Sequence, residues 1–125
     1  MTRRIKLLAI LIVAVSLDGA WASTEGKTFF ERACASCHAL SSEEPKKSGP
    51  LLRGVVGRPS GKVEGYVYSA ALSKAGLVWD AQTLDRWLED PSALVPGSSM
   101  GYAMRNPERR ALVIQYLSTL KTIGD

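Results

Sequence analysis

The feature that most constrains this chain is the pentapeptide Cys34-Ala35-Ser36-Cys37-His38. Its C-x-x-C-H spacing is the pattern for covalent attachment of a c-type haem. Two cysteines three residues apart share one face of a helix or tight turn, so both thiols can reach the two vinyl groups of one porphyrin. The histidine that follows lies under the ring, where an imidazole nitrogen can bind the iron. The pattern therefore predicts a chain that folds around a haem.

Three other interpretations compete at this motif. A structural zinc site needs four ligands, whereas Cys34, Cys37 and the only histidine, His38, supply three. A thioredoxin-like redox pair belongs beside a βαβ pattern, and none is visible in the sequence. The pentapeptide by itself leaves a disulfide or a chance match open.

The N-terminus has the parts of a secretory signal peptide. Arg3, Arg4 and Lys6 form a basic region, an apolar run follows at 7–17, and Ala20-Trp21-Ala22 is an A-x-A cleavage site. The apolar run is too short to span a bilayer comfortably. This length favours cleavage after residue 22 over the alternative, a retained signal anchor.

We therefore expect a cleaved signal peptide over residues 1–22 and one small domain over residues 23–125. Cleavage removes three basic residues and one acidic residue, which lowers the formal net charge from +4 to +2. The sequence contains no arginine-rich stretch and no aromatic platform, so nucleic acid is not an expected partner. A haem would be the largest apolar body in so small a core, and folding should depend on it.

Capping residues and apolar periodicity predict an all-α fold with long loops. Helices are expected over residues 25–35, 70–75, 81–90 and 107–121, with N-caps at Ser23 or Thr24, Ser69, Asp80 and Asn106. Between 39 and 65 the periodicity disappears, and a loop of this length usually wraps something or serves a function. Gly26 is costly inside a helix; it indicates either a close helix crossing or a frayed first turn.

The second axial ligand of the iron can be narrowed by elimination. His38 is the only histidine, and the two cysteines are used for attachment. The thioethers that remain after signal cleavage are Met100 and Met104. If both methionines were core residues, the iron would stay open, which would favour an enzyme or a gas sensor.

Assembled in order, these residues make the chain resemble a class I cytochrome c, of the mitochondrial and photosynthetic-bacterial electron-carrier type. The resemblance covers essentially all of residues 23–125. Its pieces, besides the haem motif, include Gly26-x-x-x-Phe30, Gly49-Pro50-x-Leu52, Gly57-Arg58, Tyr66-Val67-Tyr68, Gly76-Leu77-Val78-Trp79, Pro91, Pro96-Gly97-Ser98-Ser99-Met100 and Tyr116-Leu117.

The resemblance implies a class I cytochrome c fold, with helices and long loops wrapped around one haem c bound through Cys34 and Cys37. It also implies that His38 and Met100 are the axial ligands and that the Pro50 carbonyl holds the imidazole. Further residues implied to contact the haem are Arg58, Tyr68 and Trp79, at a buried propionate that needs donors, and Trp87.

Two positions depart from the family pattern. Trp87 stands where relatives usually have a tyrosine whose hydroxyl reaches the methionine sulfur. Relatives also surround the exposed haem edge with lysines, whereas this chain keeps chiefly Lys46 and Lys47. Docking is therefore expected to depend less on charge steering.

The function implied is that of a soluble, monomeric periplasmic electron carrier, not an enzyme, without stable membrane insertion after signal cleavage. Its partners would be redox proteins: a cytochrome bc1-type complex, an oxidase, a reaction centre or a periplasmic dehydrogenase. Two alternatives are a peroxidase-type haem enzyme with a displaceable Met100 and a dedicated electron-accepting subunit of one dehydrogenase. Trp87 is the only sequence support for the first, and the second would predict an interaction tail.

Overall fold

The computed structural model describes residues 18–121, so the signal-peptide features at 1–17 lie outside the described residues. Within that range the chain is all-α, and the only β-type pairing is an isolated bridge between Pro59 and Val78. This architecture confirms the expected fold class. The helices are α1 (Asp18–Ala33), α2 (Ala70–Lys74), α3 (Ala81–Glu89), α4 (Pro91–Leu94) and α5 (Pro107–Thr119).

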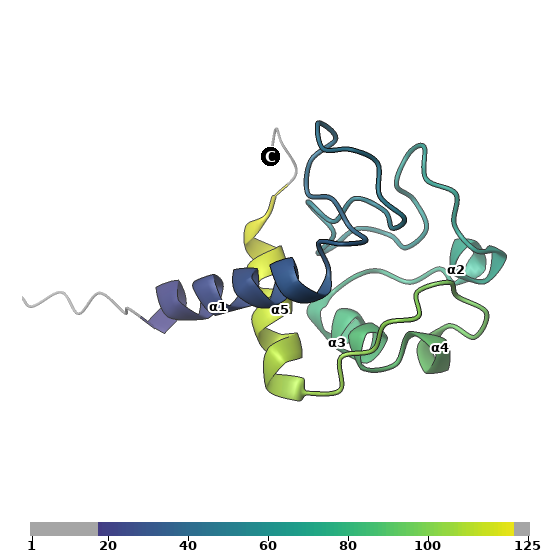
Figure 1. The fold of residues 1–125 in the computed structure, drawn as a ribbon. Coiled ribbons are helices and arrows are strands. Elements are labelled where there is room, and N and C mark those ends of the chain that lie inside the picture. The colour runs from purple at the N-terminus through teal and green to yellow at the C-terminus, as the bar shows by residue number, and fades with distance from the viewer. Residues whose placement is uncertain (1–17, 122–125) are drawn as a thin grey trace, which may run out of the picture.

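Helices α1 and α5 cross each other, and α2, α3, α4 and the long loops lie to one side of this pair (Figure 1). Gly26 lies at the crossing, because a Cβ added there would come within 2.8 Å of the Tyr116 Cβ and would also strike the backbone of Leu112. Next to it, the Phe30 and Tyr116 rings pack with their centroids 5.7 Å apart. The close-crossing interpretation of Gly26 is therefore confirmed.

Helix α1 begins earlier than the sequence predicted. It starts at Asp18, so Thr24 is an interior residue whose hydroxyl donates to the Ala20 carbonyl at 3.0 Å, and neither Ser23 nor Thr24 is the N-cap. The residues before 24 include Ala20 and Ala22, and alanine is the strongest helix former, so nothing local stops the helix at the expected place.

The other helices begin where their caps predicted. The side chains of Ser69, Asp80 and Asn106 each accept a hydrogen bond from a backbone N–H in the first turn of α2, α3 and α5. The unexpected element is α4, where Asp90 is the N-cap and Pro91 is the first helical residue. Proline ends α3 as predicted, but it also starts a new turn, because its fixed φ suits the first helical position.

Buried apolar residues follow the expected stripe of α3, with Leu84, Trp87 and Leu88 all inside. On α5 the prediction was partly wrong. Val113, Tyr116 and Leu117 are buried as expected, and Leu120, just past the helix end, is partly buried and packs against the core. Leu112 is only partly buried. Two unpredicted residues of α5, Ile114 and Arg110, are buried as well.

The loop from 39 to 65 is held by backbone hydrogen bonds rather than by helices or strands. Its N–H groups donate to carbonyls far along the chain: Gly54 to Leu120 at 2.8 Å, Gly57 to Trp79 at 2.8 Å and Ser60 to Leu77 at 2.8 Å. These bonds satisfy backbone groups that burial would otherwise leave unpaired. They fix the loop along one wall of the cavity described next.

Candidate functional site

The Cys34–His38 segment forms a tight turn at the end of α1. The Cys34 N–H donates to the Phe30 carbonyl at 2.8 Å, and the Cys37 and His38 N–H groups both return to the Cys34 carbonyl, at 3.0 and 2.9 Å. The two thiols are not joined to each other; Cys34 is buried and Cys37 is exposed. Burial raises the pKa of Cys34 to about 11, whereas a hydrogen bond from Ser48 lowers the pKa of Cys37.

The His38 ring is held in one orientation. Its Nδ1 lies 2.7 Å from the Pro50 carbonyl oxygen, and Gly49 packs so closely that an added Cβ would lie 2.5 Å from the ring Cε1. Burial lowers the pKa of His38 and the Lys47 charge lowers it further, although the Pro50 hydrogen bond opposes this. A neutral imidazole that donates from Nδ1 keeps the Nε2 lone pair for a metal.

Lys47 is tied to the attachment turn. Its Nζ donates to the Ala35 carbonyl at 2.6 Å, lies 3.4 Å from the His38 carbonyl and pairs with Glu44 at 3.4 Å. Glu44 in turn accepts from the Leu40 N–H at 2.9 Å. Backbone carbonyls therefore engage the ammonium of Lys47, one of the two lysines that remain near the expected haem edge.

A cavity of about 320 Å³ opens in front of this turn. Its volume lies in the ~300–1,000 Å³ range of ligand pockets. The walls are mainly apolar and come from the attachment turn, the loops at 48–68 and 99–102, and residues of α2, α3 and α5. The residues lining it that carry the chemistry are Cys34, Cys37, His38, Pro50, Arg58, Tyr66, Tyr68, Trp79, Trp87, Met100 and Tyr102. The cavity thus brings together all nine predicted site residues.

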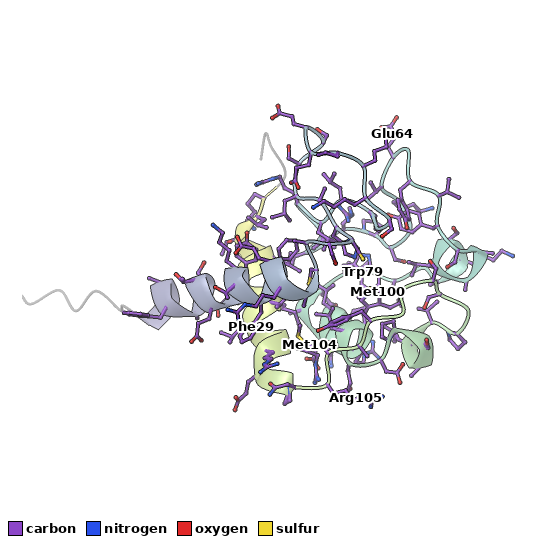
Figure 2. All side chains as sticks on the ribbon, viewed as in Figure 1. Phe29, Glu64, Trp79, Met100, Met104 and Arg105 are labelled. Atoms are coloured by element: carbon purple, nitrogen blue, oxygen red, sulfur yellow. The ribbon has the colours of Figure 1, made fainter. Side chains whose placement is uncertain are left out.

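The two methionines differ in where they lie. Met100 lines the cavity, whereas Met104 is 5% exposed and, among the described residues, does not contribute to the cavity wall. In the view of Figure 2, Met100 lies near the centre of the molecule and Met104 lies closer to α5. Of these two methionines, only Met100 lines the same cavity as His38.

Two polar residues of the wall are each held by backbone hydrogen bonds. Arg58 donates to the Leu51 carbonyl at 2.8 Å and to the Arg53 carbonyl at 3.3 Å, and its burial lowers its pKa. The Tyr68 hydroxyl accepts from the Val63 N–H at 3.2 Å. These groups face the cavity with donors that a buried carboxylate would require.

Trp79 and Trp87 pack against each other, with their ring centroids 5.2 Å apart. Both are buried and both line the cavity. An indole at position 87 has one N–H donor and a broad apolar face, so this wall is dominated by aromatic surface.

Sequence reasoning assigned no role to two tyrosines of the wall. Tyr66 packs edge-on against Tyr68, with centroids 4.6 Å apart, and donates from its hydroxyl to the Ser48 carbonyl at 2.7 Å. Tyr102 lines the cavity near Met100 and is 44% exposed. The sequence could have indicated a cavity role for Tyr102, because it is an aromatic residue in an irregular segment, two residues after the candidate ligand Met100.

A second hollow of about 400 Å³ lies over α3 and α5 and is lined by residues such as Ala81, Asp85 and Gln115. Its lining contains no cysteine, histidine or methionine. The first cavity alone combines two thiols, an imidazole with a defined tautomer and a thioether, which is the donor set of a covalently attached haem. The residues present therefore fit a haem c.

The comparisons with known proteins agree with this geometry. The Cytochrome c family model matches residues 23–121. Cytochrome c2 of Rhodopila globiformis is 46% identical over 98 residues, which cover 78% of this chain and 92% of that protein. Cytochrome c2 of Rhodomicrobium vannielii is 38% identical over 112 residues, covering 89% of each.

Among solved structures, cytochrome cH from Methylobacterium extorquens superimposes with a TM-score of 0.71 at 38% identity, covering 78% of this chain and 97% of that one. The family match covers all the residues that line the cavity, and the relatives and the solved structure each cover more than three quarters of the chain. This chain belongs to the cytochrome c family.

Proposed function

We propose that this cytochrome carries single electrons between redox proteins and is not an enzyme. The observation that carries the proposal is one cavity lined both by the attachment turn and by Met100. Haem c bound through Cys34 and Cys37 supplies the exchange of one electron between Fe(II) and Fe(III). The protein's own contribution is to hold both axial donors and to keep water away.

His38 and Met100 are the proposed axial ligands. The hydrogen bond between His38 Nδ1 and the Pro50 carbonyl supports the first assignment, because it orients the ring and leaves Nε2 free. The burial of Met104 outside the cavity supports the second. Two protein donors, His38 and Met100, would hold the iron in both oxidation states, and a thioether in apolar surroundings would favour the ferrous state.

Arg58, Tyr68 and Trp79 are proposed to hold a buried propionate, and Trp87 to close the apolar wall on the Met100 side. All four line the cavity. Arg58 already donates to two carbonyls, which fixes its guanidinium at the wall and leaves further N–H donors for a carboxylate.

We further propose export to the periplasm with cleavage after Ala22. The family match begins at residue 23, and the residues of α1 that pack inside, Gly26 and Phe30, both lie beyond the cut. No helix in the described part of the chain is long and apolar enough to cross a membrane. N-terminal sequencing of the mature protein should begin at Ser23; any other start contradicts the assignment.

The proposed partners are a cytochrome bc1-type complex, an oxidase, a reaction centre or a periplasmic dehydrogenase. The protein is proposed to bind them as a soluble monomer. The relatives named cytochrome c2 and the cytochrome cH structure support redox partners in general.

The test is the redox and ligand behaviour of purified holoprotein. A carrier should show a reversible one-electron couple, bind no carbon monoxide at neutral pH in the ferrous state and react slowly with hydrogen peroxide. Rapid binding of carbon monoxide together with peroxide turnover would instead indicate an enzyme with an exchangeable sixth position.

A further inference from the structure

Arg110 on α5 is the one charged residue that is buried among those the structure describes. Its side chain is 6% exposed. A buried charge is costly unless it is paired and hydrogen-bonded. The sequence places Arg110 at the same face of α5 as Val113 and Leu117, where an apolar residue would be expected. Its retention in the core calls for a physical reason.

The guanidinium of Arg110 joins two elements. On one side Nε donates to Asp85 of α3 at 2.7 Å, and Nη2 lies 3.9 Å from Glu89. The bond to Asp85 raises the pKa of Arg110. On the other side Nη1 donates to the carbonyls of Met104 at 3.0 Å and Arg105 at 2.9 Å. One side chain therefore connects α3 to the end of the segment that leads into α5.

That segment carries Met100. Before the methionine, the Ser98 N–H donates to the Val95 carbonyl at 3.1 Å; after it, the Met104 N–H donates to the Leu88 carbonyl at 2.6 Å. Residues 99–103 make no hydrogen bond to any other described residue. Met100 therefore lies between two hydrogen-bonded positions, Ser98 and Met104. Arg110 adds to the second of these by binding the adjacent carbonyls of Met104 and Arg105.

We propose that Arg110 is a positioning residue that holds the Met100 segment against the cavity and thereby sets how firmly the thioether stays on the iron. This inference rests on the proposed assignment of Met100 as an axial ligand. A thioether is neutral and has no charge to hold it in place, so its retention depends on the free energy needed to open its segment. Contacts that fix both ends of the segment raise that free energy.

The geometry requires an arginine. The planar guanidinium donates to two carbonyls and a carboxylate at once, whereas a lysine ammonium keeps the charge but concentrates its donors on one nitrogen. Arg110→Lys is therefore the informative variant. Arg109→Lys is the matched control, because Arg109 is the neighbouring residue on α5, is exposed, and contacts the Phe29 ring.

The experiment measures imidazole binding to the ferric holoproteins. Binding is detected as loss of the near-infrared sulfur-to-iron charge-transfer band. Imidazole competes with Met100 for the iron, so its apparent affinity reports how easily the segment opens. We expect Arg110→Lys to raise that affinity by about tenfold, as expected for the loss of a hydrogen bond to a charged group. Helix content should stay unchanged by circular dichroism, and Arg109→Lys should bind imidazole like the native protein.

The outcomes separate the two proposals. If the native protein lacks the band, the assignment of Met100 fails. If the native protein shows the band but Arg110→Lys binds imidazole within twofold of native, the positioning role is overturned and the ligand assignment stands. Should Arg110→Lys fail to fold, Asp85→Asn weakens the same tether from the more exposed side. We expect it to raise the imidazole affinity about threefold; no change there would also overturn the inference.

Discussion

The two sides of the cavity are built in different ways. On the His38 side the contacts join residues 12 positions apart within one loop: His38 binds the Pro50 carbonyl, Gly49 N–H donates to the Cys37 carbonyl at 2.7 Å, and Lys47 binds the Ala35 carbonyl. On the Met100 side the second anchor depends on α3 as well as α5, because the Met104 N–H donates to the Leu88 carbonyl and Arg110, which binds the Met104 carbonyl, pairs with Asp85 at a distance of 25 residues. One side is a locally closed loop, and the other depends on how helices pack.

This difference predicts an order of stability. Local contacts close short loops, whose entropy cost is small, whereas the Met100 segment keeps its position only while α3 and α5 stay docked. Segments with few hydrogen bonds of their own open at lower free energy than the rest of a fold. The Met100 side should therefore open before the His38 side.

The largest effect should come from removing the group that both sides face. We expect the double variant Cys34→Ala/Cys37→Ala to lack covalent haem and to be largely unfolded by circular dichroism, because the cavity would lose its main apolar filling. Ser36→Ala keeps both thiols and is the control, which should fold with haem attached. A well-folded, colourless double variant would show that the two sides do not need a shared core.

Next in size is the loss of the donor on the Met100 side. Met100→Ala should leave the haem attached and abolish the sulfur-to-iron band. The reduction potential should fall by more than about 100 mV, within the roughly 0.8 V range that axial ligands span. Met104→Leu should keep both the band and the potential and cost less than ~1.5 kcal/mol, because it is a volume-conserving core change. Persistence of the band in Met100→Ala would move the ligand to Met104.

A smaller effect on stability should show that the His38 side is packed more tightly than the Met100 side. In Gly49→Ala the new Cβ would lie 2.5 and 2.7 Å from His38 Cε1 and Nδ1, so the free energy of unfolding should fall by ~1–3 kcal/mol, as for an overpacked site. Gly101→Ala, next to Met100, is the matched control because nothing lies within 4 Å of an added Cβ there. Equal denaturation midpoints for the two variants would mean that the sides are packed alike.

The smallest effect concerns pH. Hydrogen bonds from the Leu40 N–H, with help from Lys47, lower the pKa of Glu44 below its usual 4.5. A lowered folded-state pKa means that the stabilisation is present above pH 4.5 and is lost as the pH falls through the folded-state value. Glu44→Gln should therefore be less stable than native at pH 7, with the difference in urea midpoint shrinking on acidification. Glu43→Gln is the neighbouring control. A difference in urea midpoint that does not depend on pH would contradict the proposed contribution of the ionised Glu44 carboxylate to the stability of the His38 side.

Much of the fold could be predicted from local signals. Ser69, Asp80 and Asn106 each mark a helix start, and Gly76, at φ 63°, ends α2 as a left-handed residue. The start of α1 could not be predicted this way, because alanine-rich residues before Thr24 extend the helix past the nearest cap residue.

The site was predictable in part. The attachment motif contains three residues that the structure does bring to one turn. The contacts of Lys47 could not be predicted, because its partners, the Ala35 and His38 carbonyls, are backbone atoms. Backbone acceptors leave no mark in a sequence. Arg110 was also missed, since a charge within an apolar stripe has meaning only when its partners on other elements are known.

The sequence by itself determined the haem attachment and the starts of α2, α3 and α5, because each depends on residues within a few positions of one another. Only the tertiary structure decided that Met100 faces the cavity while Met104 is buried elsewhere, and that Arg110 anchors the segment between them and α5. The physical reason is the separation of the contacts. Asp85 and Arg110 are 25 residues apart, and only packing of α3 on α5 brings such groups within hydrogen-bonding distance.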